Sequence, residues 1–196
     1  MNKIILVLGM AISSFPIFSQ GSDTFIDPRD GKSYKTVKID SQNWMAENLA
    51  YKTNSGYNEC EKNDSTVVTY GYHYDWRAAK AACPEGWHLP SYAEWMNLIN
   101  YLGGKNVAGD KLKEAGTSHW NSPNTGATNE SGFTALPSGY CNSKGIVAVG
   151  YSCLWWSATK NDATYIRSFC LLYNESVASR EDLNKIAGIS VRCIKD

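Results

Sequence analysis

The chain has 196 residues, and its 19 lysines plus arginines are balanced by 19 aspartates plus glutamates, which gives a formal net charge of zero. This balance excludes the strong electrostatic attraction on which nucleic-acid-binding proteins and proteins of anionic membrane surfaces depend. The length is enough for one domain with a sizeable hydrophobic core, and no linker divides it.

The first residues have the pattern of a secretory signal peptide. A basic start that includes Lys3 is followed by an uncharged, largely apolar run over residues 4–18. That run is too short to span a membrane comfortably. We therefore expect a signal peptide over residues 1–20 and one mature domain over 21–196, secreted or held at the cell surface, with no membrane span of its own.

The first part of the mature chain predicts a strand and then a loop. Apolar and polar residues alternate over 34–39, which indicates a strand. Residues 52–66 are rich in Asn, Ser, Lys and Glu and contain Cys60. We therefore expect a surface loop that is held by this cysteine.

Two helices are predicted on either side of a rigid corner at residues 83–91. The first begins at Asp75 and ends at Pro84, because proline cannot continue a helix. The second begins at Ser91, whose hydroxyl can accept hydrogen bonds from free backbone amides, while Glu94 can reach back to complete a capping box. Its expected buried face consists of Tyr92, Trp95, Leu98, Ile99 and Leu102.

A short third helix is predicted over 107–114, and residues 117–132 then lose all periodicity. An irregular stretch of this length in a compact domain is usually functional or disordered, and its His119 and Trp120 favour order. Short strands are expected at 133–136, 154–158, 165–173, 176–179 and 189–194. We therefore predict an α+β fold in which two to three helices precede a twisted antiparallel sheet.

The cysteines indicate disulfide bonds. All six lie in the predicted mature chain, at positions 60, 83, 141, 153, 170 and 193. An even number of cysteines in an exported chain favours disulfides over free thiols. No two are as close as Cys-x2-Cys and the three histidines are scattered, so we predict no metal site and no cofactor.

Six blocks of sequence carry a family resemblance. They are Asp27-x-Arg-Asp-Gly, Asn43-Trp-Met-Ala-Glu-Asn-Leu, Ala81-Ala-Cys-Pro-Glu-Gly-Trp-His-Leu-Pro, Gly132-Phe-Thr-Ala-Leu-Pro-Ser-Gly, Trp155-Trp-Ser-Ala-Thr and Ser190-Val-Arg-Cys. In this order, and over nearly the whole mature chain, they resemble the Fibrobacter succinogenes major paralogous domain. The resemblance implies a secreted domain of bacterial surfaces with a C-type-lectin-like fold and no established activity.

The resemblance also implies a disulfide. In C-type lectin folds the cysteine that ends the first helix is bonded to one in the last strand, which here means Cys83 with Cys193. The other four cysteines allow three pairings. Cross-strand geometry about the turn at 160–162 favours Cys153 with Cys170, which leaves Cys60 with Cys141.

A second resemblance supports a different function. Leu89-Pro-Ser-x-x-Glu-Trp is similar to the helix start of formylglycine-generating enzymes, which share the lectin-like fold. Those enzymes bind copper through two cysteines about five residues apart. The matching segment at 166–170 has Cys170 without such a partner.

Aromatic and amide side chains suggest sugar binding, because a ring face can stack on the apolar face of a pyranose. Trp155 and Trp156 are adjacent on a predicted strand and must point to opposite faces, so one of them needs a cover or a ligand. The candidate ligand-binding residues are Trp120, Asn121, Tyr140, Trp155, Asp162 and Tyr173. Neither of the motifs with which C-type lectins bind calcium is complete.

No nucleophile with an activating base can be located in the sequence. Our leading hypothesis is therefore a secreted, non-catalytic recognition or adhesion module that binds a glycan or a cell-surface protein. An enzyme of the formylglycine-generating type and a structural surface component remain the alternatives.

Overall fold

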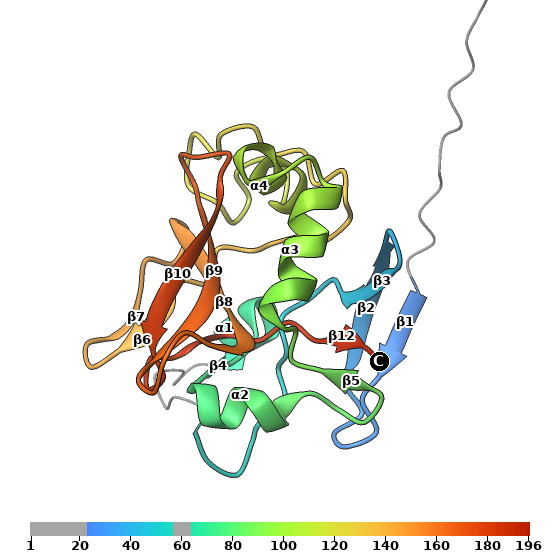
Figure 1. The fold of residues 1–196 in the computed structure, drawn as a ribbon, viewed down its shortest axis with the longest axis vertical. Helices are drawn as coiled ribbons and strands as arrows, with labels where there is room; N and C mark the ends of the chain where they lie inside the picture. The colour runs from blue at the N-terminus through green and yellow to red at the C-terminus, as the bar shows by residue number, and fades with distance from the viewer. Residues whose placement is uncertain (1–22, 57–63) are drawn as a thin grey trace, which may run out of the picture.

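The computed structural model describes residues 23–56 and 64–196 (Figure 1). The expected signal peptide lies outside these residues, and so does Cys60 with its expected bond to Cys141. Among the described residues, no helix is both long enough and apolar enough to cross a membrane. The protein is a mixed α+β fold, as predicted, with more strand than helix.

The described chain begins with strands and returns to strands after its helices. The elements are β1 (Asp23–Ile26), β2 (Ser33–Ile39), β3 (Gln42–Met45), α1 (Asp64–Tyr70), β4 (His73–Tyr74), α2 (Trp76–Ala82), β5 (Trp87–His88), α3 (Tyr92–Tyr101), α4 (Lys105–Leu112), β6 (Tyr140–Asn142), β7 (Gly145–Val147), β8 (Ser152–Lys160), β9 (Tyr165–Leu172), β10 (Ala178–Asn184), β11 (Ile189–Ser190) and β12 (Ile194–Lys195).

Two five-stranded sheets form the body of the protein. One has the order β1-β2-β3-β12-β5 and the other β10-β9-β8-β11-β4, while β6 and β7 make a separate hairpin. Pairing is antiparallel except between β11 and β8. The predicted strand at 189–194 is therefore two short strands, one in each sheet, so the end of the chain ties the sheets together.

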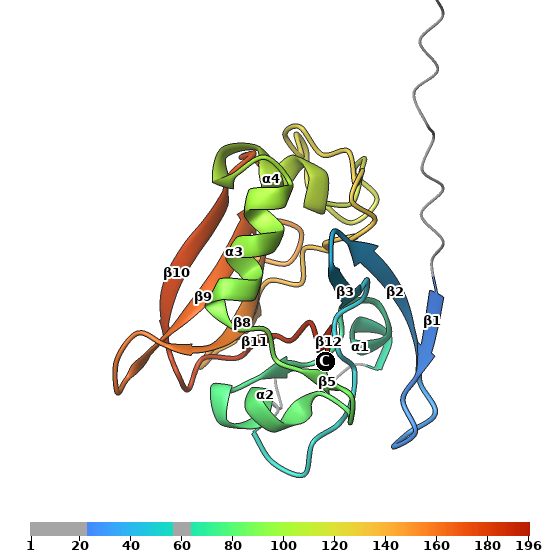
Figure 2. The same cartoon turned by 45° about the vertical axis from the view of Figure 1, so that its right-hand side comes forward.

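Helix α3 lies between the two sheets (Figures 1 and 2). Its Trp95, Leu98 and Ile99 are buried in a hydrophobic core with Trp44 of β3 and Phe169 of β9. A second core lies on the opposite face of β8 and β9, where α2 covers it and Tyr74 of β4 contributes. Because successive residues of a strand point to opposite faces, β8 supplies side chains to both cores.

The helix starts are confirmed in detail. The Asp75 side chain caps α2 by accepting a hydrogen bond from the Ala78 amide at 2.7 Å. At α3, Ser91 and Glu94 form the predicted capping box, in which the Glu94 carboxylate accepts from the Ser91 amide at 2.7 Å. The third helix runs over Lys105–Leu112, two residues earlier than predicted.

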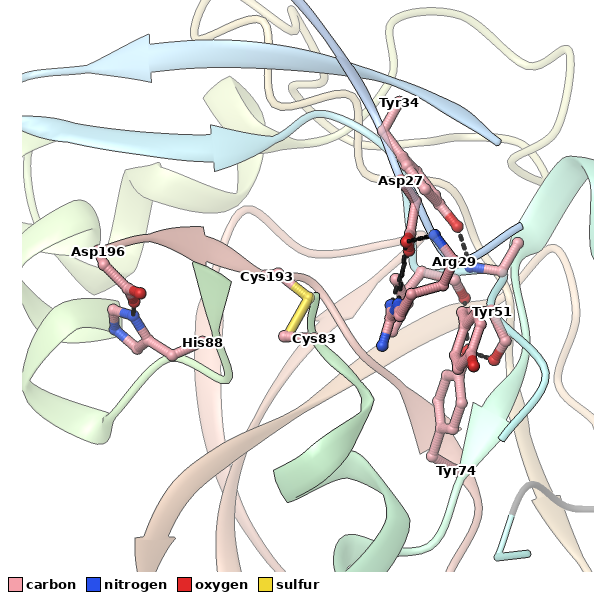
Figure 3. Close-up of a disulfide and its surroundings, with 11 residues drawn as sticks. Asp27, Arg29, Tyr34, Tyr51, Tyr74, Cys83, His88, Cys193 and Asp196 are labelled. Atoms are coloured by element: carbon pink, nitrogen blue, oxygen red, sulfur yellow. Dashed lines mark hydrogen bonds and ion pairs between the residues drawn. A yellow bond between two sulfur atoms is a disulfide. The ribbon is translucent and has the colours of Figure 1, made fainter. Parts of the chain in front are cut away.

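The disulfide between Cys83 and Cys193 is confirmed (Figure 3). It joins the end of α2 to the residue before β12, across 110 residues of chain. Closing a loop of this length stabilises a fold by roughly 4–5 kcal/mol in chain-entropy models. The bond therefore fixes the corner at 83–91 to the end of the chain.

The predicted bond between Cys153 and Cys170 is wrong, because both are free and buried. Cys153 is opposite Leu171 in the antiparallel register and Cys170 is opposite Leu154. The two cysteines are thus one residue out of register and point to opposite faces of the sheet, Cys153 into the first core and Cys170 into the second.

Two further expectations need correction. Helix α1 begins within the expected surface loop at 52–66. The expected strand at 133–136 is irregular, with an isolated bridge between Lys113 and Ala135. Thr134, just before the bridge, has a positive φ of 53°, which interrupts the extended backbone that a strand needs.

Candidate functional site

Two of the predicted binding residues are core residues. Trp120 is 1% exposed, and its indole Nε1 donates a hydrogen bond to the carbonyl of Ala135 at 2.8 Å. Trp155 is equally buried and donates to Asn48 Oδ1 at 2.8 Å. Neither ring offers a face to a ligand, so their expected stacking role is corrected. Trp156, on the other face of β8, is also covered and bonded, to the Tyr74 carbonyl.

Two other predicted residues serve local structure. Asp162 is exposed in the turn between β8 and β9, and its Oδ1 accepts hydrogen bonds from the amides of Thr164 and Tyr165 at 2.7 and 2.8 Å. These bonds lower the pKa of Asp162. Tyr140 is half-buried in β6 and packs against the second core. The geometry explains both without a ligand.

The remaining predicted residues, Asn121 and Tyr173, both contact the turn at Gly150 and Tyr151. Tyr173 follows β9, and its amide donates to the carbonyl of Tyr151 at 2.9 Å. The rings of Tyr151 and Tyr173 are nearly perpendicular, with centroids 5.2 Å apart. The Asn121 amide N–H donates to the Gly150 carbonyl at 2.8 Å, which places Asn121 beside Tyr151. We call Asn121, Tyr151 and Tyr173 the tyrosine platform.

The side chains of the platform have unused hydrogen-bonding groups. Tyr151 is 50% exposed, whereas Tyr173 packs partly against the first core. The side-chain amide of Asn121 lies against Gly150, where an added Cβ would come within about 3.0 Å of it. Neither this amide nor either tyrosine hydroxyl forms a hydrogen bond within the described part of the chain. The platform thus combines an exposed ring with polar groups available to a ligand.

Sequence reasoning missed Tyr151, which is one of twelve tyrosines. It lies in a turn where its amide donates to the carbonyl of Ala148, a residue with a positive φ of 59°. No local pattern separates it from the buried tyrosines. Only the folding of the 117–132 loop against the end of β9 makes it part of a site.

A buried cluster joins four of the family-like sequence blocks. The Asn48 Oδ1 accepts a hydrogen bond from Trp155 Nε1 at 2.8 Å and another from Arg192 Nη2 at 2.9 Å. The guanidinium of Arg192 lies 4.1 Å from the centre of the Phe133 ring. We call Asn48, Phe133, Trp155 and Arg192 the arginine hub. Each of the four residues comes from a different one of the family-like sequence blocks, so their packing together gives those blocks a structural role.

Another block forms a turn at the edge of the first sheet (Figure 3). The Asp27 carboxylate is fully buried and accepts two hydrogen bonds from the Arg29 guanidinium, at 2.9 and 2.7 Å. Arg29 also lies over the ring of Tyr51, 3.7 Å from its centre. Burial alone would raise the pKa of Asp27, but the bonds from Arg29 outweigh it and lower the pKa. This arrangement is structural.

The corner contains a histidine between two carboxylates. His88 Nδ1 lies 2.5 Å from Asp196 Oδ1, and Nε2 lies 2.8 Å from Glu94 Oε1. Burial alone would lower the pKa of His88, but these partners outweigh it and raise the pKa. The nearby Ser91 hydroxyl donates to Glu94 at 2.8 Å, not to His88. Both ring nitrogens are occupied, so His88 has none left to activate a nucleophile.

Metal ligands do not gather in the described regions, where no group of three or more His, Cys, Asp or Glu side chains could hold an ion. The second histidine pair, His119 with Glu114, has Nδ1 2.9 Å from both carboxylate oxygens. His119 thus contacts one carboxylate, whereas His88 contacts two. Among the predicted binding residues, those of the tyrosine platform keep polar groups available to a ligand.

Comparisons with known proteins give one match. A family model described as the Fibrobacter succinogenes major domain matches residues 37–195. No curated protein and no solved structure matches the chain. The matched residues make up most of the chain and contain the platform, the hub and the corner.

Proposed function

The chain belongs to the Fibrobacter succinogenes major domain family, and from this premise we propose that it is a non-catalytic recognition module that binds a glycan at the tyrosine platform. The proposal includes secretion or display at the cell surface and a C-type-lectin-like fold. The disulfide from the end of α2 to the last residues of the chain supports that fold. The function itself rests on the geometry of the platform.

A pyranose presents an apolar face of C–H groups and a rim of hydroxyls. The half-exposed ring of Tyr151 suits the apolar face. The Asn121 amide has donors and an acceptor, which suit a pair of neighbouring hydroxyls. The ring of Tyr173 packs nearly at a right angle against that of Tyr151 and restrains it before binding, which lowers the entropy cost of binding. The half-exposed Tyr151 ring, with the unbonded Asn121 amide against the preceding Gly150, is the observation that carries the proposal.

Binding to a broad set of immobilised glycans, followed by calorimetry with the best ligand, tests the proposal. Tyr151→Ala should weaken binding by about tenfold, because it removes the stacking face. Asn121→Ala should weaken binding by a few-fold, through the lost hydrogen bonds. Tyr165→Ala is the matched control, since Tyr165 is 45% exposed at the start of β9 and should bind as the wild type does.

Two results would contradict the proposal. One is a wild-type protein that binds no glycan in the set, and the other is an equal loss of affinity in Tyr151→Ala and Tyr165→Ala. Concentration-dependent self-association in the ultracentrifuge, without glycan binding, would instead favour a structural surface component.

The geometry disfavours the copper enzyme. Burial raises the pKa of Cys170 to about 12, so its thiolate is scarce at neutral pH. Cys153, the other free thiol of the described chain, points to the opposite face of the sheet. The two sulfurs cannot close on one ion without unpairing β8 from β9. Copper(I) binding that disappears in Cys170→Ser would revive the enzyme hypothesis.

A further inference from the structure

A groove of about 570 Å³ lies between the first sheet and helix α1. Residues of β2 and the segment after β3 form one wall, and α1 forms the other with Val67, Val68 and Thr69. Thr134 and Arg192 contribute to its lining. The tyrosine platform does not line this groove, so the two sites can be tested separately.

Arg192 brings a buried positive charge to the groove. Its side chain is 1% exposed, and its pKa is lowered to about 9, because burial disfavours the charged form. None of the carboxylates in residues 23–56 and 64–196 forms an ion pair with it. Its partners are the neutral Asn48 Oδ1 and the carbonyls of Phe133 and Thr134, together with the rings of Phe133 and Trp155. A buried cation without an anionic partner is costly.

The guanidinium is not saturated. It has five N–H groups, and four of them are used: Nε with Asn48, Nη1 with Phe133, and Nη2 with Asn48 and Thr134. One N–H on Nη1 therefore has no acceptor in the described part of the protein. An oxygen that reached it from the groove would complete the set and partly neutralise the charge.

The groove wall also contains a strained residue. Thr134 has a φ of 53°, which is unfavourable for a β-branched side chain. Asn129 holds it there, since Asn129 Oδ1 accepts from the Thr134 amide at 2.8 Å and Asn129 Nδ2 donates to Thr134 Oγ1 at 3.0 Å. This conformation directs the Thr134 carbonyl to Arg192 at 3.4 Å. Strain of this kind often accompanies ligand sites.

Arg192 is the buried one among the charged residues that line the groove. The lining includes Lys32, Lys35, Glu47 and Glu114 besides Arg192. Lys32 lies 3.8 Å from Asp30, and Glu114 is paired with His119. The exposed Glu47 accepts a hydrogen bond from the Lys35 amide at 2.7 Å and acts on Arg192 only through space.

We propose that this groove binds a carboxylate group, carried by a sugar acid or by a short organic acid, with its charge facing Arg192. The carboxylate supplies the acceptor and the negative charge that the hub lacks. The hydroxyls of a sugar acid would meet the polar wall, which includes Thr36, Thr69 and Glu47. The site does not depend on glycan binding at the tyrosine platform.

Titration of the folded protein with sodium glucuronate, sodium acetate and glucose, followed by amide NMR shifts, tests the proposal. Glucuronate should shift the amides of Thr36, Ala46 and Thr134 in a saturable way, and glucose should not. Saturable shifts with acetate at the same amides would identify the carboxylate alone as the ligand. A glucuronate response without an acetate response would identify a sugar acid.

Val68 allows a charge test that does not disturb the core, because it is 86% exposed on the groove wall. Val68→Glu should weaken glucuronate binding by about two- to five-fold and Val68→Lys should strengthen it similarly, with Val68→Gln unchanged. Added salt should shrink the difference. Val107→Glu on α4, at an exposed apolar residue outside the groove lining, is the control and should bind normally.

The proposal fails if none of the acids shifts the groove amides of the wild type, or if Val68→Glu and Val68→Lys bind glucuronate equally. Tyr151→Ala should leave glucuronate binding at the groove unchanged. If glycan binding is lost in that variant while the groove response persists, the two sites are independent. Loss of both responses in Tyr151→Ala would contradict the assignment of the carboxylate to the groove.

Discussion

The arginine hub and the tyrosine platform use similar side chains in opposite ways. In the hub, the oxygen of Asn48 accepts from Trp155 and twice from Arg192, and its nitrogen donates to the Tyr70 carbonyl. In the platform, the amide of Asn121 has no such partner. Buried polar groups must be satisfied by the protein itself, whereas exposed ones can be left for a ligand. Substitutions in the hub should therefore change stability, and substitutions in the platform should change binding.

The largest expected effect is the difference in reactivity of the two buried thiols between the native and the denatured protein. Cys153 is fully buried, which raises its pKa well above the ordinary value, and the pKa of Cys170 is raised to about 12. For Cys170 this shift alone reduces the thiolate fraction by roughly a thousandfold. Iodoacetamide should therefore leave both thiols unmodified in the native protein and modify both after denaturation. Mass spectrometry that finds a bond between Cys153 and Cys170 would overturn the strand register.

Substitutions of Trp120 and Tyr151 compare the loss of a buried ring with the loss of an exposed one near the same loop. Trp120→Ala should destabilise the fold by about 3–5 kcal/mol, because it leaves a large cavity and removes one of the two hydrogen bonds to the Ala135 carbonyl. Tyr151→Ala should change stability by no more than about 0.5 kcal/mol. Urea denaturation of both variants measures this difference. A stable Trp120→Ala variant that has lost glycan binding would restore Trp120 as a binding residue.

Asn48 and Asn121 allow the same substitution in both regions. Asn48→Ala should cost about 2–4 kcal/mol, because it removes the shared acceptor and leaves the Arg192 charge less well satisfied. Asn121→Ala should be close to neutral, since only its side-chain amide is lost. Thermal unfolding monitored by circular dichroism checks both. Equal losses would show that the amide of Asn121 has a structural role.

The smallest expected effect comes from His88, whose side chain is less buried than the arginine hub and less exposed than Tyr151. Its folded-state pKa is raised above the unfolded value of about 6.5, so the cluster with Glu94 and Asp196 stabilises the fold fully below that pH. The contribution is lost as pH rises through the folded pKa, and it is less than about 1 kcal/mol because solvent screens the charges. Urea denaturation across neutral pH should show this slope, and His88→Gln should remove it.

Local signals in the sequence predicted α2, α3 and the corner between them well, but not α1. A capping box depends on residues three apart, as Ser91 and Glu94 are, so it can be seen without tertiary information. The prolines and the alternation at β2 are equally local. The bond of Cys83 with Cys193 was expected from the family resemblance and not from the spacing of the cysteines.

The candidate site was predicted in part. Asn121 and Tyr173 were predicted to bind a ligand and both contact the turn at 150–151, whereas Trp120 and Trp155, for which the same role was predicted, are buried. A tryptophan in an irregular loop can point inwards or outwards with the same local sequence. The missing partner, Tyr151, meets Tyr173 only after the turn before β8 has formed.

The sequence alone determined the helix boundaries at the corner, the alternation of adjacent side chains along the strands and the class of the fold. The tertiary structure decided which face each of these side chains met. A difference of one residue in the β8–β9 register keeps Cys153 from facing Cys170. The packing of the 117–132 loop against β9 decides that Trp120 is buried while Tyr151 stays exposed. Register and loop packing depend on contacts between distant residues, which local propensities do not encode.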